Sequence, residues 1–228
     1  MDDLKEERRA RLRAMAAEFE ERGDTLGWFD AFYKEAEGDN ANIPWADLEP
    51  NHYFSIWARE HDLKGNGRTA LVVGCGLGDD AKFLSDLGFK VTAFDISPTA
   101  IEWAKKLYPD SEINFVAADL FNPPSEWKSA FDFVLEIYTI QPLPLEMRPQ
   151  VIDAIASFVK EDGMLVAVTR SREDDEEPVQ LPWPVSRRDL SRFEQSGLTQ
   201  TSFTIMPTLE EGEQDRFIVE YKMQRPAR

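Results

Sequence analysis

A glycine-rich segment directly follows a short apolar run, and it reads Val73-Gly74-Cys75-Gly76-Leu77-Gly78-Asp79-Asp80. Glycines at alternate positions let a backbone turn tightly and approach a bound molecule closely. The two carboxylates open the expected next helix, at the place where a phosphate would otherwise be attracted. They repel a pyrophosphate and suit a ligand that carries an amino group or a positive sulfur. A tight turn without a ligand is the alternative, because one glycine-rich turn is a weak signal.

Two further acids end the next two expected strands. Asp95 ends the run FKVTAFD and precedes Ile96 and Ser97, and an acid there can accept hydrogen bonds from both hydroxyls of a ribose. Asp119, followed by Leu120, ends the run EINFVAAD, and its carboxylate can accept from an adenine amino group. The alternatives are a helix cap for the first acid and a solvated loop acid for the second. We expect Asp95 to lie at the surface and to add little to the core.

A fourth apolar run, FDFVLEIY, carries Glu136, Ile137 and Tyr138 at its end. Ligands of open α/β sheets bind beyond the carboxyl ends of the strands, so these residues are expected to face a cleft. Glu136, Tyr138 and His52 are candidate general bases for a reaction in which a nucleophile must lose a proton. Cys75 is interpreted as a small filler of the glycine turn. The two histidines and the single cysteine do not have metal-site spacing, so no metal is expected.

The elements that must position these residues alternate along the chain from residue 65. The expected strands are TALVVG, FKVTAFD, EINFVAAD, FDFVLEIY and MLVAVTR. The expected helices between them are DDAKFLSDLG, SPTAIEWAKKLYP and LEMRPQVIDAIASFVKEDG, the last closed by Gly163. This alternation with short connections predicts a doubly wound α/β sheet, whose parallel strands end at one edge. The glycine turn and the three acids are therefore expected to lie together.

The two ends of the chain complete the expected architecture. SRRDLSRFEQSGL is predicted to be a helix with a capping box from Ser186 and Asp189, and SFTIMP and DRFIVEYKM form an antiparallel hairpin at the sheet edge. Apolar residues at helical spacing predict helices within residues 1–64, which form a cap on a domain of residues 65–228. The cap aromatics Trp28 and Trp45 either pack in the core or contact the ligand.

Composition excludes several classes of function. The chain has 228 residues, 42% of them hydrophobic, with one cysteine and a formal net charge of −17. So acidic a protein repels a nucleic-acid backbone and anionic membranes, so neither is an expected partner. No apolar run is long enough for a membrane span, and the charged first twenty residues do not resemble a signal peptide. We therefore expect a cytoplasmic protein, monomeric by default.

The four motifs together resemble those of class I S-adenosylmethionine-dependent methyltransferases over roughly residues 65–170. The resemblance implies a Rossmann-like, seven-stranded, mostly parallel sheet, S-adenosyl-L-methionine as cofactor and a small-molecule methyl acceptor. It also implies a set of cofactor-contacting residues: Trp28, Trp45, Gly74, Cys75, Gly76, Gly78, Asp79, Asp95, Ile96, Ser97, Asp119, Leu120, Glu136 and Ile137.

A narrower resemblance is to the thiopurine and thiol/halide methyltransferases. It rests on Trp28, on the stretch Ile43-Pro44-Trp45-Ala46-Asp47, on the glycine turn, and on two proline-containing segments, residues 141–148 and 181–186. Pro142, Leu145, Trp183 and Pro184 depart from that group's pattern. This resemblance implies S-methylation of a thiol or thiopurine-like acceptor. The alternatives are O- or N-methylation of a small metabolite, an NAD-dependent oxidoreductase, and a non-catalytic cofactor-binding protein.

Overall fold

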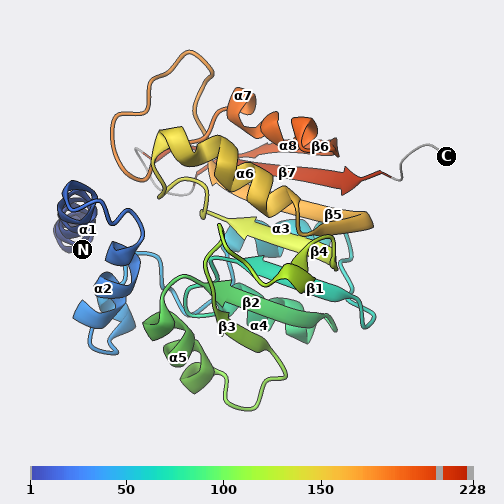
Figure 1. Cartoon of the computed structure of the whole chain (residues 1–228), viewed down its shortest axis with the longest axis horizontal. Helices are drawn as coiled ribbons and strands as arrows, with labels where there is room; N and C mark the ends of the chain where they lie inside the picture. The colour runs from blue at the N-terminus through green and yellow to red at the C-terminus, as the bar shows by residue number, and fades with distance from the viewer. Residues whose placement is uncertain (1, 209–212, 225–228) are drawn as a thin grey trace.

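The computed structural model describes residues 2–208 and 213–224 of the chain. Within that part, seven strands form one sheet in the order β3-β2-β1-β4-β5-β7-β6 (Figure 1). The strands are β1 (Thr69–Val73), β2 (Lys90–Asp95), β3 (Asn114–Ala117), β4 (Phe131–Ile137), β5 (Val159–Arg170), β6 (Leu198–Met206) and β7 (Arg216–Met223). Strands β1 to β5 pair in parallel, and β7 runs antiparallel between β5 and β6. The predicted fold class, including the C-terminal hairpin, is confirmed.

The helices cover both faces of the sheet and one of its ends. They are α1 (Asp2–Glu21), α2 (Gly27–Glu35), α3 (His52–Glu60), α4 (Asp79–Asp86), α5 (Pro98–Leu107), α6 (Arg148–Ala156), α7 (Arg187–Leu190) and α8 (Arg192–Gln195). Short 3-10 turns lie at Asn40–Asn42, Ser125–Trp127 and Leu145–Met147. Among the described residues, no helix is long and apolar enough to cross a bilayer.

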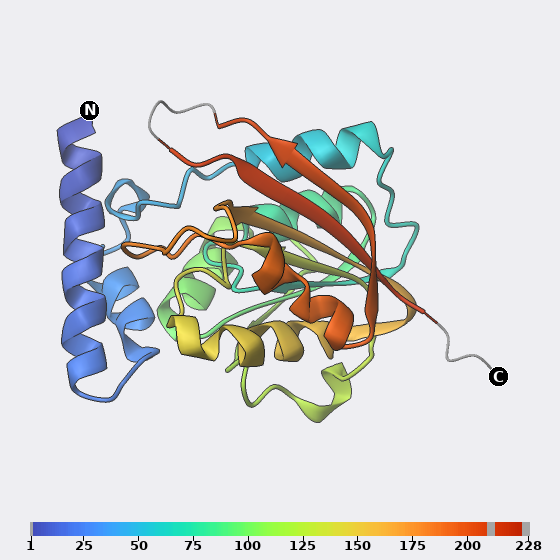
Figure 2. The same ribbon diagram turned by 90° about the horizontal axis from the view of Figure 1, so that it is seen from above.

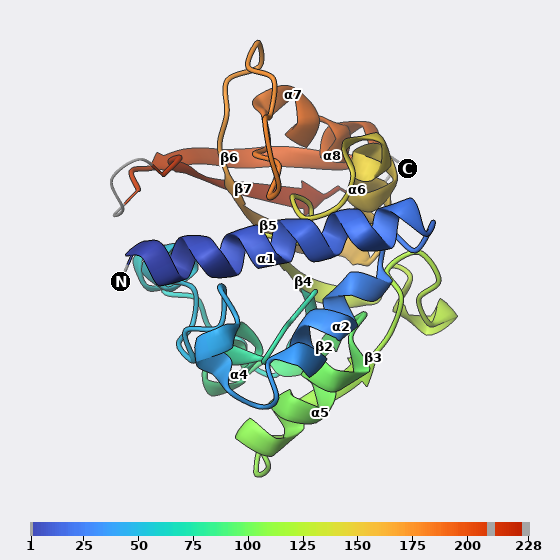
Figure 3. The ribbon, with the colours of Figure 1, turned by 90° about the vertical axis from the view of Figure 1, so that its left-hand side faces the viewer.

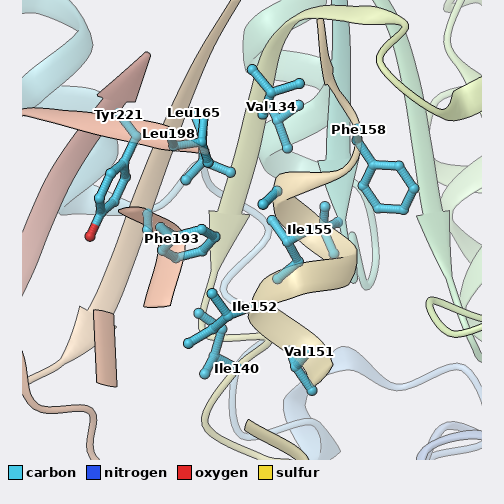
Figure 4. Packing of buried hydrophobic residues seen from close by; sticks show 14 of the residues in the cluster. Val134, Ile140, Val151, Ile152, Ile155, Phe158, Leu165, Phe193, Leu198 and Tyr221 are labelled. Atoms are coloured by element: carbon cyan, nitrogen blue, oxygen red, sulfur yellow. The ribbon is translucent and has the colours of Figure 1, made fainter. Parts of the chain in front are cut away.

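Continuous apolar runs form the central strands because both of their faces are buried. In β1, Leu71 and Val73 point into the core on the side of α6 and α8, whereas Ala70 and Val72 point into the core on the side of α3, α4 and α5. Figure 4 shows the first of these cores, in which Ile152 and Ile155 of α6 lie among side chains from the strands. Burial on both faces holds the strand ends rigidly in place.

The N-terminal helices α1 and α2 lie beside the carboxyl ends of the parallel strands (Figures 1 and 3). Their apolar faces form a third core, here called the cap core. Its buried members are Leu12, Met15, Trp28, Phe32, Tyr33, Ala36, Ile43, Ala46, Leu77, Ala100 and Leu181. The connection of residues 171–186 reaches toward α1 in Figure 2 and contributes Leu181 to this core. The cap is therefore assembled from both halves of the sequence.

Polar contacts fix the cap and this connection to the sheet. Asp30 of α2 accepts hydrogen bonds from the Ser97 hydroxyl at 2.7 Å and from the Thr99 backbone N–H at 3.0 Å, at the start of α5. Asp189, in the predicted capping box with Ser186, accepts from Arg148 at 2.7 Å and from Arg172 at 3.0 Å.

Three expected elements differ in the structure. α3 lies in the expected cap segment, yet it packs on one face of the sheet through Phe54 and Trp57. α6 ends at Ala156 and β5 begins at Val159, so Gly163 lies inside a strand and does not close the helix. The reason is that Phe158 and Val159 are fully buried in the core beside β4. The expected C-terminal helix is two short turns, α7 and α8. The boundary at residue 64 stays a prediction.

Candidate functional site

A cavity of about 1170 Å³ opens at the carboxyl ends of β1, β2 and β4, beneath the cap. Typical small-molecule sites measure roughly 300–1,000 Å³. The cavity therefore has room for a nucleoside-sized molecule together with a second small molecule. The glycine turn, the cap aromatics and the connection after β5 all contribute to its wall.

The three glycines of the turn have different roles. Gly74 has a φ of +60°, and an added Cβ would lie 2.6 Å from the Thr139 hydroxyl. Gly76 has a φ of +53°, and an added Cβ would lie 3.0 Å from the Tyr33 hydroxyl. Both line the cavity. Gly78 does not: an added Cβ there would lie 2.7 Å from the Phe115 ring, so this glycine permits helix–strand packing.

Asp95 lies under the glycine turn and lines the cavity. Its Oδ2 accepts from the Gly76 N–H and its Oδ1 from the Ser97 N–H, each at 2.9 Å. The residue is only 7% exposed, so the expected surface acid is wrong. Burial raises the pKa of Asp95, although the two backbone hydrogen bonds act in the opposite direction.

Ser97 and Ile96 follow Asp95 but lie on different sides of the backbone. Ile96 lines the cavity. Ser97 is fully buried away from it, where its hydroxyl accepts from the Ala100 N–H and donates to Asp30. The Ser97 side chain therefore caps α5 and binds the cap, and its expected contact with a cofactor stays a prediction.

Asp79 and Asp80 begin α4 and both line the cavity. Asp79 accepts from the Tyr108 hydroxyl at 2.5 Å, and Asp80 accepts from the Asn51 N–H at 2.7 Å. Burial raises the pKa of Asp80 to about 7, with a further contribution from the neighbouring Asp79 charge. Burial also raises the pKa of Asp79. A cation between the two carboxylates would stabilise their ionised forms.

Asp119 and Leu120 lie at the end of β3 and line the cavity, as does Ile137 at the end of β4. The Asp119 carboxylate accepts from the Phe121 N–H at 2.8 Å, which fixes its orientation. The carboxylates of Asp95, Asp119 and the α4 pair thus surround one cavity, as their positions after successive strands predict.

Glu136 does not face this cavity. Its side chain is fully buried, and Oε1 accepts from the backbone N–H groups of Thr139 at 2.7 Å and Ile140 at 3.1 Å. Burial raises the pKa of Glu136 to about 7. Strand alternation turns the Glu136 side chain into the core, so the structure does not bring it into the cavity, and its expected catalytic and cofactor-contacting roles stay predictions. It stabilises the turn that follows β4.

That turn presents Tyr138, which has a φ of +59° and lines the cavity. Its hydroxyl accepts a hydrogen bond from Arg216 Nε at 2.8 Å. The other candidate base, His52, is exposed at the cavity rim beside the Tyr53 ring. Tyr138 is thus the better oriented of the two.

The cap aromatics and the cysteine also line the cavity. Trp28 is buried and stacks on Phe29, whereas Trp45 is 39% exposed and donates to the Tyr33 hydroxyl at 2.8 Å. Burial raises the pKa of the Cys75 thiol well above its usual value, which keeps it protonated. The two tryptophans are therefore placed where they can contact a ligand. Cys75 is placed where a small side chain fills the glycine turn.

Sequence reasoning missed the arginines that line the cavity, of which Arg9, Arg170 and Arg216 lie around Glu213. Arg170 ends β5, so the rule that ligands bind at carboxyl ends of strands could have found it. Arg216 begins β7, and an antiparallel strand places its first residue at the same edge. Tyr33 also lies in the cavity wall. Its sequence context, one of several aromatic residues in a helix, does not indicate a binding role.

Comparisons with known proteins agree with this geometry. Residues 70–163 match a family described as a methyltransferase domain. The chain is 30% identical over 130 residues to 2-methyl-6-phytyl-1,4-hydroquinone methyltransferase of Synechocystis, covering 56% of this chain and 40% of that protein. It is 32% identical over 104 residues to thiocyanate methyltransferase 1 of Brassica oleracea. This match covers 43% of this chain and 45% of that protein. The matches thus span less than half the length of these two relatives.

Among solved structures, the fold resembles a Burkholderia thailandensis enzyme, 1,6-didemethyltoxoflavin-N1-methyltransferase, crystallised with 1,6-didemethyltoxoflavin and S-adenosylhomocysteine. The TM-score is 0.67 at 14% identity, over 86% of this chain and 88% of that one. At this identity the likeness concerns the fold alone. The family match, the two relatives and the sheet order agree with the four motifs. Residues 70–163 thus match a methyltransferase domain, in agreement with the resemblance to class I S-adenosylmethionine-dependent methyltransferases that the motifs predict.

Proposed function

We propose that this protein is an enzyme that binds S-adenosylmethionine and methylates a small molecule. The observation that carries the proposal is the convergence of carboxylates from three strand ends on one cavity beside the glycine turn. An ammonium group, a ribose diol and an adenine amino group are donors that such carboxylates accept from. A pyrophosphate, which an NAD-dependent oxidoreductase must bind, would meet Asp79 and Asp80 instead.

The residues present fit the cofactor. Each Asp95 oxygen accepts one backbone hydrogen bond, which leaves a lone pair on each for one hydroxyl of a ribose. Asp80, whose pKa burial raises to about 7, gains a favourable partner if an ammonium group lies beside it. Asp119 lies where its carboxylate would accept a hydrogen bond from an adenine amino group. S-adenosylmethionine supplies a methyl group that its positive sulfur already activates.

The chain's own residues then have to orient the acceptor and exclude water. The cap core closes the cavity from the side opposite the sheet, with Trp28 and Leu181 buried in it. Tyr138 lies at the end of β4 with its hydroxyl fixed by Arg216, so it is positioned to contact the acceptor. These residues provide alignment and enclosure, which methyl transfer to a good nucleophile chiefly requires.

For the acceptor we propose a thiol or similar soft nucleophile. The local similarity to a thiocyanate methyltransferase supports this choice. A thiol ionises near neutral pH and needs no strong base. A hydroxyl or amine acceptor would require a base, for which Tyr138 and His52 are the candidates.

The experiment is calorimetric titration of the purified protein with S-adenosylhomocysteine and, separately, with NAD⁺. S-adenosylhomocysteine release is then followed with matched thiols, phenols and amines. We expect binding of S-adenosylhomocysteine only, and release with thiols. NAD⁺ binding alone would overturn the proposed cofactor. Release with phenols or amines instead would keep the methyltransferase and reject the thiol, and cofactor binding without release from any acceptor would indicate a non-catalytic binding protein.

A further inference from the structure

Three arginine side chains from distant parts of the chain converge on one carboxylate in the wall of the cavity. Arg9 of α1 pairs with Glu213 Oε1 at 2.7 Å, and Arg170 at the end of β5 pairs with Oε2. Arg216, the first residue of β7, lies 3.6 Å from the same Oε2. All four residues line the cavity. Both carboxylate oxygens of Glu213 are thus held by guanidinium groups.

Arg216 is the most rigidly oriented of the three. Its Nε donates to the Tyr138 hydroxyl at 2.8 Å and its Nη1 donates to the carbonyl oxygen of Gln214. Its guanidinium lies over the rings of Tyr53 and Tyr138, with its carbon 5.3 and 5.7 Å from their centroids. The side chain is only 7% exposed. Such a guanidinium loses little freedom when it binds an anion.

This cluster contrasts with the rest of the protein. The chain has a formal net charge of −17, which repels anions at long range. A group of arginines inside a cavity of such a protein provides local attraction for an anion. Glu213 demonstrates the chemistry, because a carboxylate of the chain itself already fits among the three guanidinium groups. Charge-assisted hydrogen bonds of this kind are the strong ones.

We propose that the methyl acceptor carries, besides its nucleophilic atom, a carboxylate group that binds to Arg9, Arg170 and Arg216 in exchange for Glu213. The proposal rests on the proposed function, since it names the substrate class of the same cavity. The anionic group lies beside Tyr138, at the end of β4, whose hydroxyl contacts Arg216. The nucleophilic atom then projects toward the glycine turn.

The test uses benzoate and its neutral analogue benzamide as probes. Each is titrated calorimetrically into the full chain saturated with S-adenosylhomocysteine, so that the cofactor positions are occupied. We expect benzoate to bind at least about tenfold more tightly than benzamide, because charge-assisted hydrogen bonds distinguish them. Equal affinities, or no binding of benzoate to protein that binds S-adenosylhomocysteine, would overturn the inference and leave the proposed function intact. Failure to bind S-adenosylhomocysteine would instead reject the proposed function.

Variants assign the effect to the cluster. Glu213→Gln removes the competing carboxylate and is expected to tighten benzoate binding by about tenfold. Arg9→Gln, on the partly exposed face of α1, is expected to weaken it severalfold while S-adenosylhomocysteine binding persists. The matched control is Arg192→Gln, which removes a guanidinium that pairs with Asp153 outside the cavity. If Glu213→Gln does not change benzoate affinity, or if the control weakens it as much as Arg9→Gln, the cluster is not the anion site.

Discussion

The carboxylate of Asp95 holds the backbone of the glycine turn, because its Oδ2 accepts a hydrogen bond from the Gly76 N–H at 2.9 Å. The same carboxylate accepts from the Ser97 N–H at the start of α5. One side chain therefore joins the ends of two strands and faces the cavity with its remaining lone pairs. Its roles in folding and in binding are coupled.

Asp95→Asn is expected to affect both roles. The new amide group presents a donor where two backbone donors need acceptors, so the free energy of unfolding falls by about 1–2 kcal/mol. S-adenosylhomocysteine affinity falls about tenfold or more, because a ribose hydroxyl loses its charged acceptor. Urea unfolding and calorimetry measure the two effects. Asp86→Asn, at the exposed end of α4, is the control, and an equal loss of affinity there would count against the assignment.

Glu136 predicts how stability depends on pH. Burial raises its pKa to about 7 in the folded protein, against about 4.3 in an unfolded chain. The folded state therefore binds the proton more tightly, so this stabilisation is complete below about pH 4 and is lost as pH rises through about 7. Glu136→Gln keeps Oε1 as an acceptor and removes the titration. The unfolding free energy of this variant is expected to fall less between about pH 5 and about pH 8 than that of the wild type. The difference between the two falls is roughly 1–3 kcal/mol. An unchanged slope, or the same change in the exposed variant Glu126→Gln, would contradict this.

Asp80 predicts how ligand binding depends on pH. Burial raises its pKa to about 7, so it is largely protonated at about pH 6 and ionised at about pH 8. An ammonium group binds to the ionised form, so S-adenosylhomocysteine affinity is expected to rise severalfold over this range. Asp80→Asn should bind weakly with no such rise. Adenosine, which lacks the amino group, is the matched ligand, and a similar rise with adenosine would place the titrating group elsewhere.

The Asp30 contact with α5 predicts how firmly the cap is attached. Asp30→Ala removes the acceptor for the Ser97 hydroxyl and the Thr99 N–H. We expect faster hydrogen exchange in α2 and a loss of about 1–2 kcal/mol of stability, since buried donors lose their partner. Lys34→Met is the control, because Lys34 is an exposed partner of Asp30 and such surface pairs contribute about 0–1 kcal/mol. Equal exchange in the two variants would show that the hydrogen bonds to α5 do not hold the cap.

Sequence patterns predict the sheet well because its strands are buried on both faces and are therefore apolar throughout, as in Thr69–Val73. They fail where tertiary contacts override local preference. The segment after Ala156 continues the apolar pattern of a helix. Burial of Phe158 and Val159 in the core beside β4 outweighs that local preference. A left-handed turn does occur there, at Asp162 with a φ of +61°, one residue before the glycine expected to provide it.

The candidate site divides in a similar way. The position of Asp95 follows from one rule about strand ends, and the structure brings it into the cavity. Glu136 satisfies the same rule, yet the two-residue period of its strand turns it inward. Arg216 lies outside the rule because it begins an antiparallel strand. Its place depends on the pairing of β5 with β7, which single-sequence patterns do not specify.

The composition of the cap core has a consequence for the order of folding during synthesis. The helices α1 and α2, each with one apolar face, leave the ribosome before Leu77, Ala100 and Leu181, which complete the core from much later in the chain. Contacts of such long sequence separation form slowly. The faces that carry Leu12 and Trp28 therefore stay exposed while more than a hundred further residues are added, as the interval from residue 28 to residue 181 requires. We therefore expect the nascent N-terminal segment to be a binding target for chaperones until the connection after β5 has been made.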